Sequence, residues 1–173
     1  QGKSDSDGES RLDLGQVLEL ARPSSRYNQG EMGLDVTSYF RSDEECFPCG
    51  AHAVHLTVDP ETGKIEIERY VVAEDVGHVI NPMILTGQLV GATAQGIGAT
   101  ILEELVYDEG GQPLAGSLVD YLLPTSRDIP PIESEVIDLA PSPLNPLGVK
   151  GAGEIGIVAT GAALSNAVSQ ALS

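Results

Sequence analysis

The segment 148–156 (GVKGAGEIG) limits the possible folds of this chain more than any other stretch. It places four glycines, one lysine and one glutamate within nine residues. Three prolines between 141 and 146 precede it, and a helix of small residues is expected after it, from about 157 to 172. Glycines let the backbone approach a ligand closely, and a helix N-terminus offers unpaired N–H groups. From these residues alone, the segment is either a ligand-contacting loop or a structural turn.

Two nucleotide-binding motifs are excluded for this segment. Residues 151–156 match G-x-G-x-x-G, but the dinucleotide fingerprint needs a β-strand directly before it. The proline-rich stretch 141–147 cannot be a central parallel strand. A phosphate-binding P-loop needs its lysine after the glycines, whereas Lys150 precedes Gly151 and Gly153.

The charge balance restricts the partners. The net charge of −17 argues against nucleic acid and anionic membrane surfaces. No apolar run approaches the roughly 18 residues of a membrane span, and no signal peptide is visible at the N-terminus. We therefore expect a cytoplasmic protein with an acidic surface.

The periodicity predicts an α+β fold of mixed β-hairpins and helices. Residues 1–11 read as a polar, acidic tail, and 12–173 as the folded portion. A short amphipathic helix is expected over 14–21, and an irregular segment over 22–38.

A β-hairpin is predicted from 51 to 74, with its turn at 60–63. In its first strand the alternation places His52 on the same face as the apolar residues. In its second strand the alternation groups Val71 with the apolar residues and Tyr70 with the glutamates.

A glycine-rich helix is predicted after Asn81, from Pro82 to about residue 105. Four internal glycines suggest a break near Gly96, with a ligand near Gln95 and Gly96. From its residue type alone, Gln95 makes hydrogen bonds either to buried backbone groups or to a polar ligand. A second hairpin is expected over 105–115, and another strand over 131–139.

Two cysteines and two histidines spell C-x2-C-x2-H-x2-H, namely Cys46, Cys49, His52 and His55. These are zinc-type ligands. On a strand, however, His52 and His55 point to opposite faces. Small buried thiols beside a strand are therefore favoured, and no metal ligand is predicted. A small zinc-binding module stays as an alternative.

Several motifs together resemble the C-terminal part of the large subunit of molybdenum hydroxylases, the xanthine dehydrogenase, aldehyde oxidase and carbon monoxide dehydrogenase family. The resemblance runs from about residue 12 to the end of the chain. The motifs stand in family order: FPCGAH at 47–52, DPETG at 59–63, DVGHVINP at 75–82, GQLVGATAQGIG at 87–98, GSLVDYLLP at 116–124 and PLNPLGVKGAGEIG at 143–156.

This resemblance implies an oxidoreductase with molybdenum on a molybdopterin, often in its cytosine dinucleotide form. Glu154 matches the glutamate beside the metal and would act as general base. Gln95, with the adjacent Gly96, matches a pterin contact, while Lys150, Gly151 and Gly153 match the cofactor-contacting loop. The implied reactions are oxidation of carbon monoxide, aldehydes or heterocycles, with water as the oxygen source.

The family's large subunits are several times longer than this chain. We therefore expect one portion of a larger molybdopterin-binding domain, inactive by itself. Its partners would be the remainder of the large subunit and the subunits that carry iron–sulfur clusters and FAD. The alternative is a fold fragment or assembly piece without bound cofactor.

Overall fold

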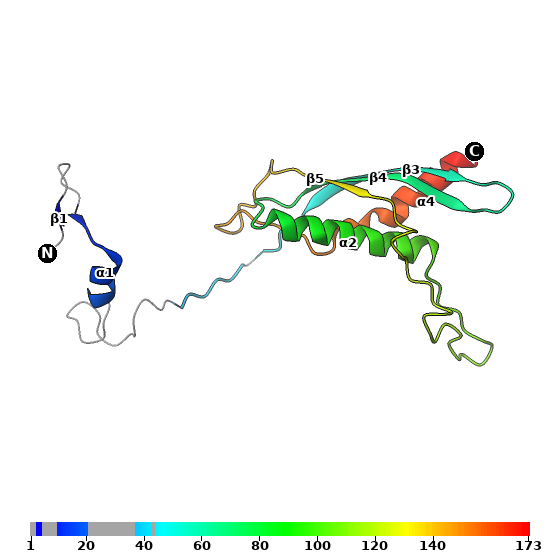
Figure 1. Cartoon of the computed structure of the whole chain (residues 1–173), viewed down its shortest axis with the longest axis horizontal. Coiled ribbons are helices and arrows are strands. Elements are labelled where there is room, and N and C mark those ends of the chain that lie inside the picture. Colours follow the sequence, from blue (N-terminus) through cyan, green and yellow to red (C-terminus); the bar gives the residue numbers. More distant parts are fainter. Residues whose placement is uncertain (1–2, 5–9, 21–36, 43) are drawn as a thin grey trace. The chain divides into compact units, whose positions relative to one another are not determined.

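The computed structural model describes residues 3–4, 10–20, 37–42 and 44–173. The chain divides into two compact units, 1–41 and 42–173 (Figure 1). The predicted boundary between residues 11 and 12 stays a prediction. Most of the predicted irregular segment, 22–36, lies outside the described residues.

The first unit contains two short strands and one helix. Strand β1 (Lys3–Ser4) pairs antiparallel with β2 (Ser10–Arg11), and helix α1 spans Leu14–Leu20. Asp13 and Gln16 cap this helix reciprocally: the Gln16 N–H donates to Asp13 Oδ1 over 2.8 Å, and the Asp13 N–H donates to Gln16 Oε1 over 3.1 Å. The predicted helix is confirmed through Leu20, and its expected last residue, Ala21, lies outside the described residues.

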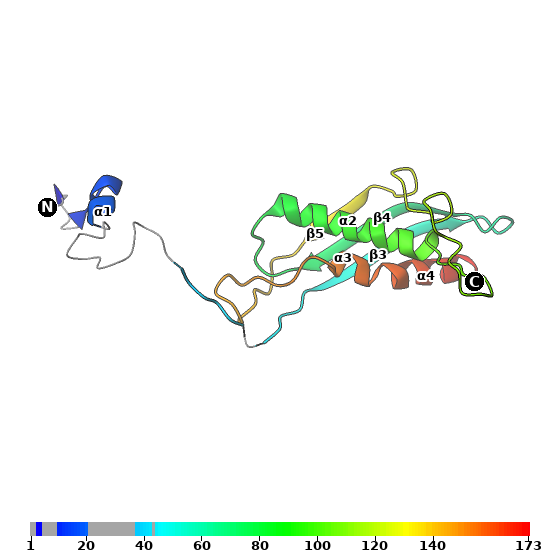
Figure 2. The ribbon, with the colours of Figure 1, turned by 90° about the horizontal axis from the view of Figure 1, so that it is seen from below.

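The second unit is a three-stranded sheet with helices on one face (Figures 1 and 2). Strands β3 (Cys49–Val58) and β4 (Ile65–Asp75) form the predicted hairpin, and β5 (Ile132–Val136) adds to β4 in parallel, so β4 is central. Helices α2 (Pro82–Ile101), α3 (Ile155–Val158) and α4 (Thr160–Ala171) supply the helical layer. The α+β prediction is confirmed.

A β-bulge changes which residues of β4 face the helices. Leu56 pairs with Ile67, but His55 pairs with Arg69, so Glu68 is an extra residue in the ladder. Beyond it the alternation flips. Tyr70 is therefore fully buried and Val71 only partly, and the predicted phase was wrong at this point.

Helix α2 begins as predicted, with the Asn81 side chain accepting the Ile84 N–H at 3.1 Å. The predicted break near Gly96 is wrong, because the helix runs unbroken through it to Ile101. The glycine serves close packing instead: a Cβ on Gly96 would lie 2.7 Å from Thr160 Cβ on α4.

Two other predicted elements differ from the structure. The expected hairpin over 105–115 is reduced to one isolated bridge between Tyr107 and Pro113. The expected last helix is divided at Ala159 into α3 and α4. At this division the Gly156 carbonyl accepts the side-chain hydroxyls of Thr160 and Thr93, at 2.8 and 3.2 Å.

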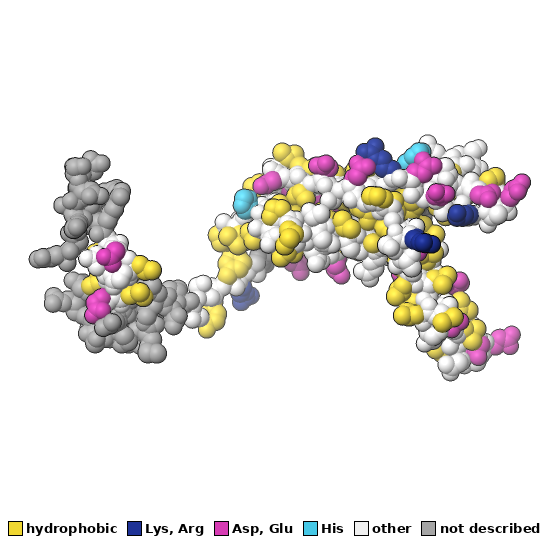
Figure 3. All heavy atoms as spheres, in the orientation of Figure 1, with side chains coloured by type: hydrophobic (Ala, Val, Ile, Leu, Met, Phe, Trp, Pro, Cys, Tyr) yellow, Lys and Arg dark blue, Asp and Glu magenta, His cyan; other side chains and the backbone are white. Residues whose placement is uncertain are grey.

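The core lies between the sheet and the helices, in two apolar clusters around Leu56 and Leu89. Apolar side chains are also exposed on segment 103–124, which follows α2 (Figure 3). The large exposed ones there are Leu105, Val106, Tyr107, Leu114, Leu118, Val119, Leu122 and Leu123. Within the described ranges no helix is both long and apolar enough to cross a membrane.

Candidate functional site

A pocket of about 540 Å³ opens between the glycine segment and the start of β3. Its size falls in the range of small-molecule and cofactor sites, which is about 300–1,000 Å³. One wall comes from the chain around β3 and the other from the glycine segment and α3. The lining residues are Cys46, Phe47, Pro48, Cys49, Gly50, His52, Gly151, Ala152, Gly153, Glu154, Ile155, Val158 and Ala159.

Backbone contacts hold the glycine segment against the end of β4. Gly77 and Gly148 have φ of +66° and +68°, which favours glycine. The Gly148 carbonyl accepts the N–H groups of His78 and Ser142, both at 3.0 Å. The Lys150 N–H donates to the Val76 carbonyl at 2.9 Å. These hydrogen bonds therefore fix the position of the backbone where the glycine segment reaches the pocket.

The Asn145 side chain closes the turn that leads into the segment. Its Nδ2 donates to the Val149 carbonyl at 2.8 Å, and its Oδ1 accepts the Val149 N–H at 3.0 Å. This pair of bonds reproduces a backbone ladder pair with an amide side chain. These bonds thus hold the proline-rich stretch 141–147 in a defined conformation, although it forms no strand.

Lys150 turns its side chain inward and pairs with Asp75. The Lys150 Nζ lies 3.2 Å from Asp75 Oδ1, and the two side chains are only 12% and 11% exposed. Asp75 Oδ1 also accepts the Gly77 N–H at 2.9 Å. This backbone hydrogen bond, followed by the contact with Lys150, holds the pKa of Asp75 below its ordinary value. The ion pair therefore fastens the glycine segment to the end of β4.

We predict that Asp75→Asn destabilises the chain at neutral pH and much less in acid. Because the folded pKa of Asp75 is lowered, its contribution is full above the unfolded-state value of about 3.9 and is lost as the pH falls below it. Urea unfolding midpoints of both proteins from pH 7 to pH 3 would measure this difference. Glu104→Gln, at an exposed carboxylate, is the control. A gap between the proteins that stays constant across this range would contradict the assignment.

Glu154 belongs to the wall of the pocket. It is an exposed pocket-lining residue at the N-cap position of α3, and its side chain makes no capping hydrogen bond. A Cβ on neighbouring Gly153 would meet nothing within 4 Å, and one on Gly151 only Pro48 Cδ at 3.9 Å. A ligand in this pocket can therefore approach the backbone at both glycines and the carboxylate of Glu154.

The structure brings together only some of the predicted site residues. Glu154, Gly151 and Gly153 line the pocket, and Lys150 supports it through Asp75. Lys150 also lines a second pocket of about 330 Å³ on the other side of the segment. Gln95 is exposed on α2 and lines neither of these two pockets, and the neighbouring Gly96 is buried against α4.

The zinc-type residues do not converge on one point. The His52 side chain is 2% exposed, whereas that of His55 is 71% exposed and lies 3.1 Å from Glu68 on the outer face. Both cysteines line the pocket; Cys46 is half-buried with its Sγ 3.5 Å from the Val149 carbonyl. Cys49 is exposed, so the prediction of a buried thiol was wrong there, because the pocket opens beside it.

Three residues of this region were missed from the sequence: Asp75, Asn145 and Glu74. Asp75 and Asn145 stand within the family motifs but were assigned no role there, and only the fold brings them to the glycine segment. Glu74 shares the strand face of Tyr70 and Val72, but the predicted phase placed this face outward, so its burial was not foreseen. The period of a strand places these three on one face.

Comparisons with known proteins identify the class. A model of the molybdopterin cofactor-binding domain family matches residues 5–130, so the chain belongs to this family. It is 40% identical over 149 residues to the 6-hydroxypseudooxynicotine dehydrogenase complex subunit gamma of Paenarthrobacter nicotinovorans, covering 86% of this chain and 19% of that protein. The resemblance to large subunits of molybdenum enzymes is thereby confirmed.

Two solved structures agree with the fold. CO dehydrogenase from Oligotropha carboxidovorans matches with a TM-score of 0.84 at 30% identity, over 95% of this chain and 20% of that one. Quinoline 2-oxidoreductase from Pseudomonas putida 86 matches with a TM-score of 0.68 at 43% identity, over 71% of this chain and 16% of that one. The chain spans about a fifth of the length of the curated relatives that it matches.

Proposed function

We propose that this chain supplies one wall of the active site of a molybdenum-dependent hydroxylase, with Glu154 as the general base. One observation carries the proposal: Glu154 lines a cofactor-sized pocket across from the β3 wall. The family to which the chain belongs names the cofactor as a molybdopterin. The open backbone at Gly151 and Gly153 fits such a group, because side chains there would fill the space it needs.

When bound, the molybdenum cofactor supplies the two-electron oxidation and the water-derived oxygen. The task of this chain is to bind, orient and move a proton. Glu154 accepts the proton at a carboxylate oxygen, which an exposed, unbonded side chain can do. Gly151 and Gly153 let the cofactor approach the backbone. The Asp75–Lys150 ion pair holds the glycine segment at the end of β4. Gln95 is proposed as a further pterin contact, with Gly96 beside it.

The names of the relatives favour nitrogen heterocycles as the substrate class. Among the most similar relatives are a nicotine 6-hydroxylase large subunit, 39% identical, and quinoline 2-oxidoreductase, 43% identical. Carbon monoxide is the second candidate, because a carbon monoxide dehydrogenase large chain is 35% identical. We further propose the cytosine dinucleotide form of the cofactor, a cytoplasmic location, and partner subunits that carry iron–sulfur clusters and FAD.

A bulky side chain at Gly153 tests the cofactor assignment. Gly153→Leu in the complete enzyme should lower the molybdenum and pterin content by at least about tenfold, because the leucine occupies the space beside Glu154. The backbone tolerates this change, since Gly153 is not among the glycines with positive φ. Gly116→Leu, also at an open position, is the matched control.

Metal analysis separates the alternatives. Unchanged molybdenum content in Gly153→Leu would contradict the proposed site. One equivalent of zinc in the purified protein would support the zinc-binding module. An assembly that carries neither metal would support the inactive fold fragment.

A further inference from the structure

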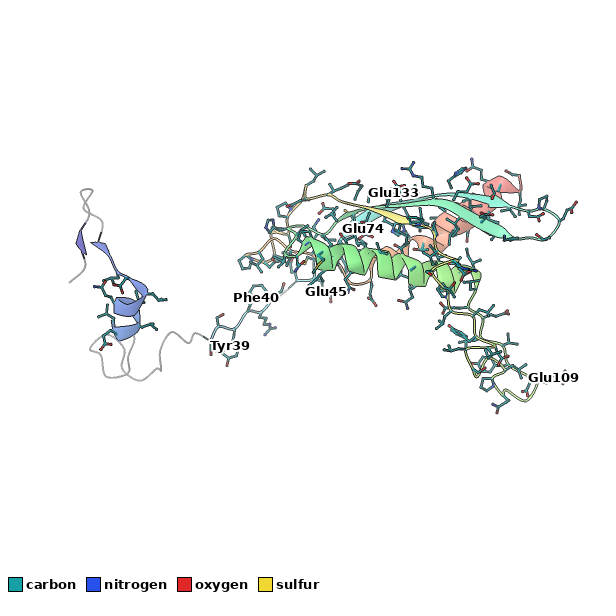
Figure 4. The ribbon with its side chains drawn as sticks, in the orientation of Figure 1. Tyr39, Phe40, Glu45, Glu74, Glu109 and Glu133 are labelled. Carbon is teal, nitrogen blue, oxygen red and sulfur yellow. The ribbon has the colours of Figure 1, made fainter. Side chains whose placement is uncertain are left out.

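Three polar side chains, those of Tyr70, His52 and Glu74, form a row on the otherwise apolar inner face of the sheet next to the pocket. His52 on β3 pairs with Val72 on β4, so Tyr70 and Glu74 are its two diagonal neighbours. The His52 Nδ1 lies 2.9 Å from the Tyr70 hydroxyl, and its Nε2 lies 3.7 Å from Glu74 Oε1. Figure 4 shows Glu74 between the sheet and α2, whereas Glu133 lies on the other side of the sheet.

Glu74 is an unusual residue for this position. Its side chain has no exposed surface, and among the described residues neither of its carboxylate oxygens has a hydrogen-bond partner. A buried carboxylate without donors costs several kcal/mol, so such groups are either paired or protonated. His52 is the histidine within reach, and Gly50 leaves room for the contact, since a Cβ there would lie 2.9 Å from Glu74 Cγ.

The Tyr70 hydroxyl occupies the other side of the His52 ring. It lies 2.9 Å from Nδ1, and the two rings meet edge to face with their centroids 5.8 Å apart. Burial raises the pKa of Tyr70, so the hydroxyl keeps its proton. Because Tyr70 engages Nδ1, Nε2 is the ring nitrogen that remains to face Glu74.

We propose that Glu74 and His52 share one proton and act as a positioning pair for the pocket that contains Glu154. His52 belongs to the β3 wall of the pocket, and Glu74 contacts it from the neighbouring strand β4. The pair thus fixes the β3 wall, which lies across the pocket from the glycine segment. Only this role for the pocket depends on the proposed function.

The experiment uses ¹⁵N-histidine NMR on the full chain, which contains three histidines. Single His55→Gln and His78→Gln variants assign the signals. We expect Nε2 of His52 to be hydrogen-bonded at neutral pH, unlike Nε2 of the two exposed histidines. Glu74→Gln should keep this hydrogen bond and near-normal stability, because the amide of glutamine can donate to or accept from Nε2. A His52 ring whose Nε2 makes no hydrogen bond would overturn the proposal.

A double-mutant cycle measures the pairing independently of turnover. His52→Ala leaves Glu74 alone and should raise the unfolding equilibrium constant strongly, whereas His52→Ala combined with Glu74→Met should recover most of the loss. The double variant should unfold at least about tenfold less readily than the product of the single effects predicts. Additive effects would overturn the pairing.

The positioning role has its own readout in the same proteins. In the stable double variant the amide signals of Cys49 and Gly50 in the β3 wall should shift, while in Glu74→Gln they should stay in place. Unshifted signals in the double variant would overturn the positioning role. None of these measurements uses enzymatic activity, so a failure of the proposed base at Glu154 would leave their outcome unchanged.

Discussion

Replacing Glu154 by glutamine should lower turnover of the complete enzyme by about 10²–10⁴-fold while molybdenum stays bound. Glutamine has nearly the same shape and fills the same part of the pocket wall, but it cannot accept a proton. Because the Glu154 side chain makes no capping hydrogen bond, the change removes no contact that holds α3. The measurement is kcat with quinoline, nicotine and carbon monoxide as test substrates, together with molybdenum content per enzyme.

Glu104→Gln is the matched control for this prediction. It removes one exposed carboxylate from the segment after α2, away from the pocket lining. Its turnover should stay within about twofold of the parent enzyme, since exposed charges act weakly across solvent. Near-normal turnover of Glu154→Gln with full molybdenum content would remove Glu154 from the role of base. Loss of molybdenum would instead make Glu154 a cofactor contact.

Local rules predicted much of this fold correctly. The β3–β4 hairpin followed from alternation around the turn at 60–63, and the start of α2 followed from Asn81 before Pro82. The glycine segment was recognised as the centre of the site, although its local residues left a structural turn equally open. Its link to a cofactor came from the order of many motifs along the chain and stays a prediction, because the family match covers residues 5–130.

The errors arise where a distant segment decides the local structure. Nothing near Gly96 in the sequence shows that Thr160 packs on it, so a break was predicted where the glycine serves close packing inside a continuous helix. The extra residue at Glu68 reverses the faces of β4, so Tyr70 and Glu74 entered the core unforeseen. The ion pair of Lys150 with Asp75 joins the glycine segment to the end of β4, although the whole α2 and β5 region separates them in the sequence. Single-sequence periodicity carries no information about such contacts.

Gly77→Ala should be the most destabilising single change near the site, with a loss of about 2–5 kcal/mol in the free energy of unfolding. Two costs add. Alanine is disfavoured at φ of +66°, and its Cβ would lie 2.2 Å from the Gly148 carbonyl oxygen. That oxygen accepts the N–H groups of His78 and Ser142, so it cannot move aside without breaking both bonds. Urea unfolding of the chain would measure the loss.

Gly63→Ala separates the two costs. Gly63 has φ of +73°, but a Cβ there would meet nothing within 4 Å, so only the backbone cost of about 1–2 kcal/mol applies. The additional loss in Gly77→Ala then measures how rigidly the glycine segment is held against the end of β4. Equal losses of unfolding free energy in the two variants would mean that the glycine segment moves aside at no cost. In that case the Gly77–Gly148 contact could not be what holds Gly151, Gly153 and Glu154 in place at the pocket.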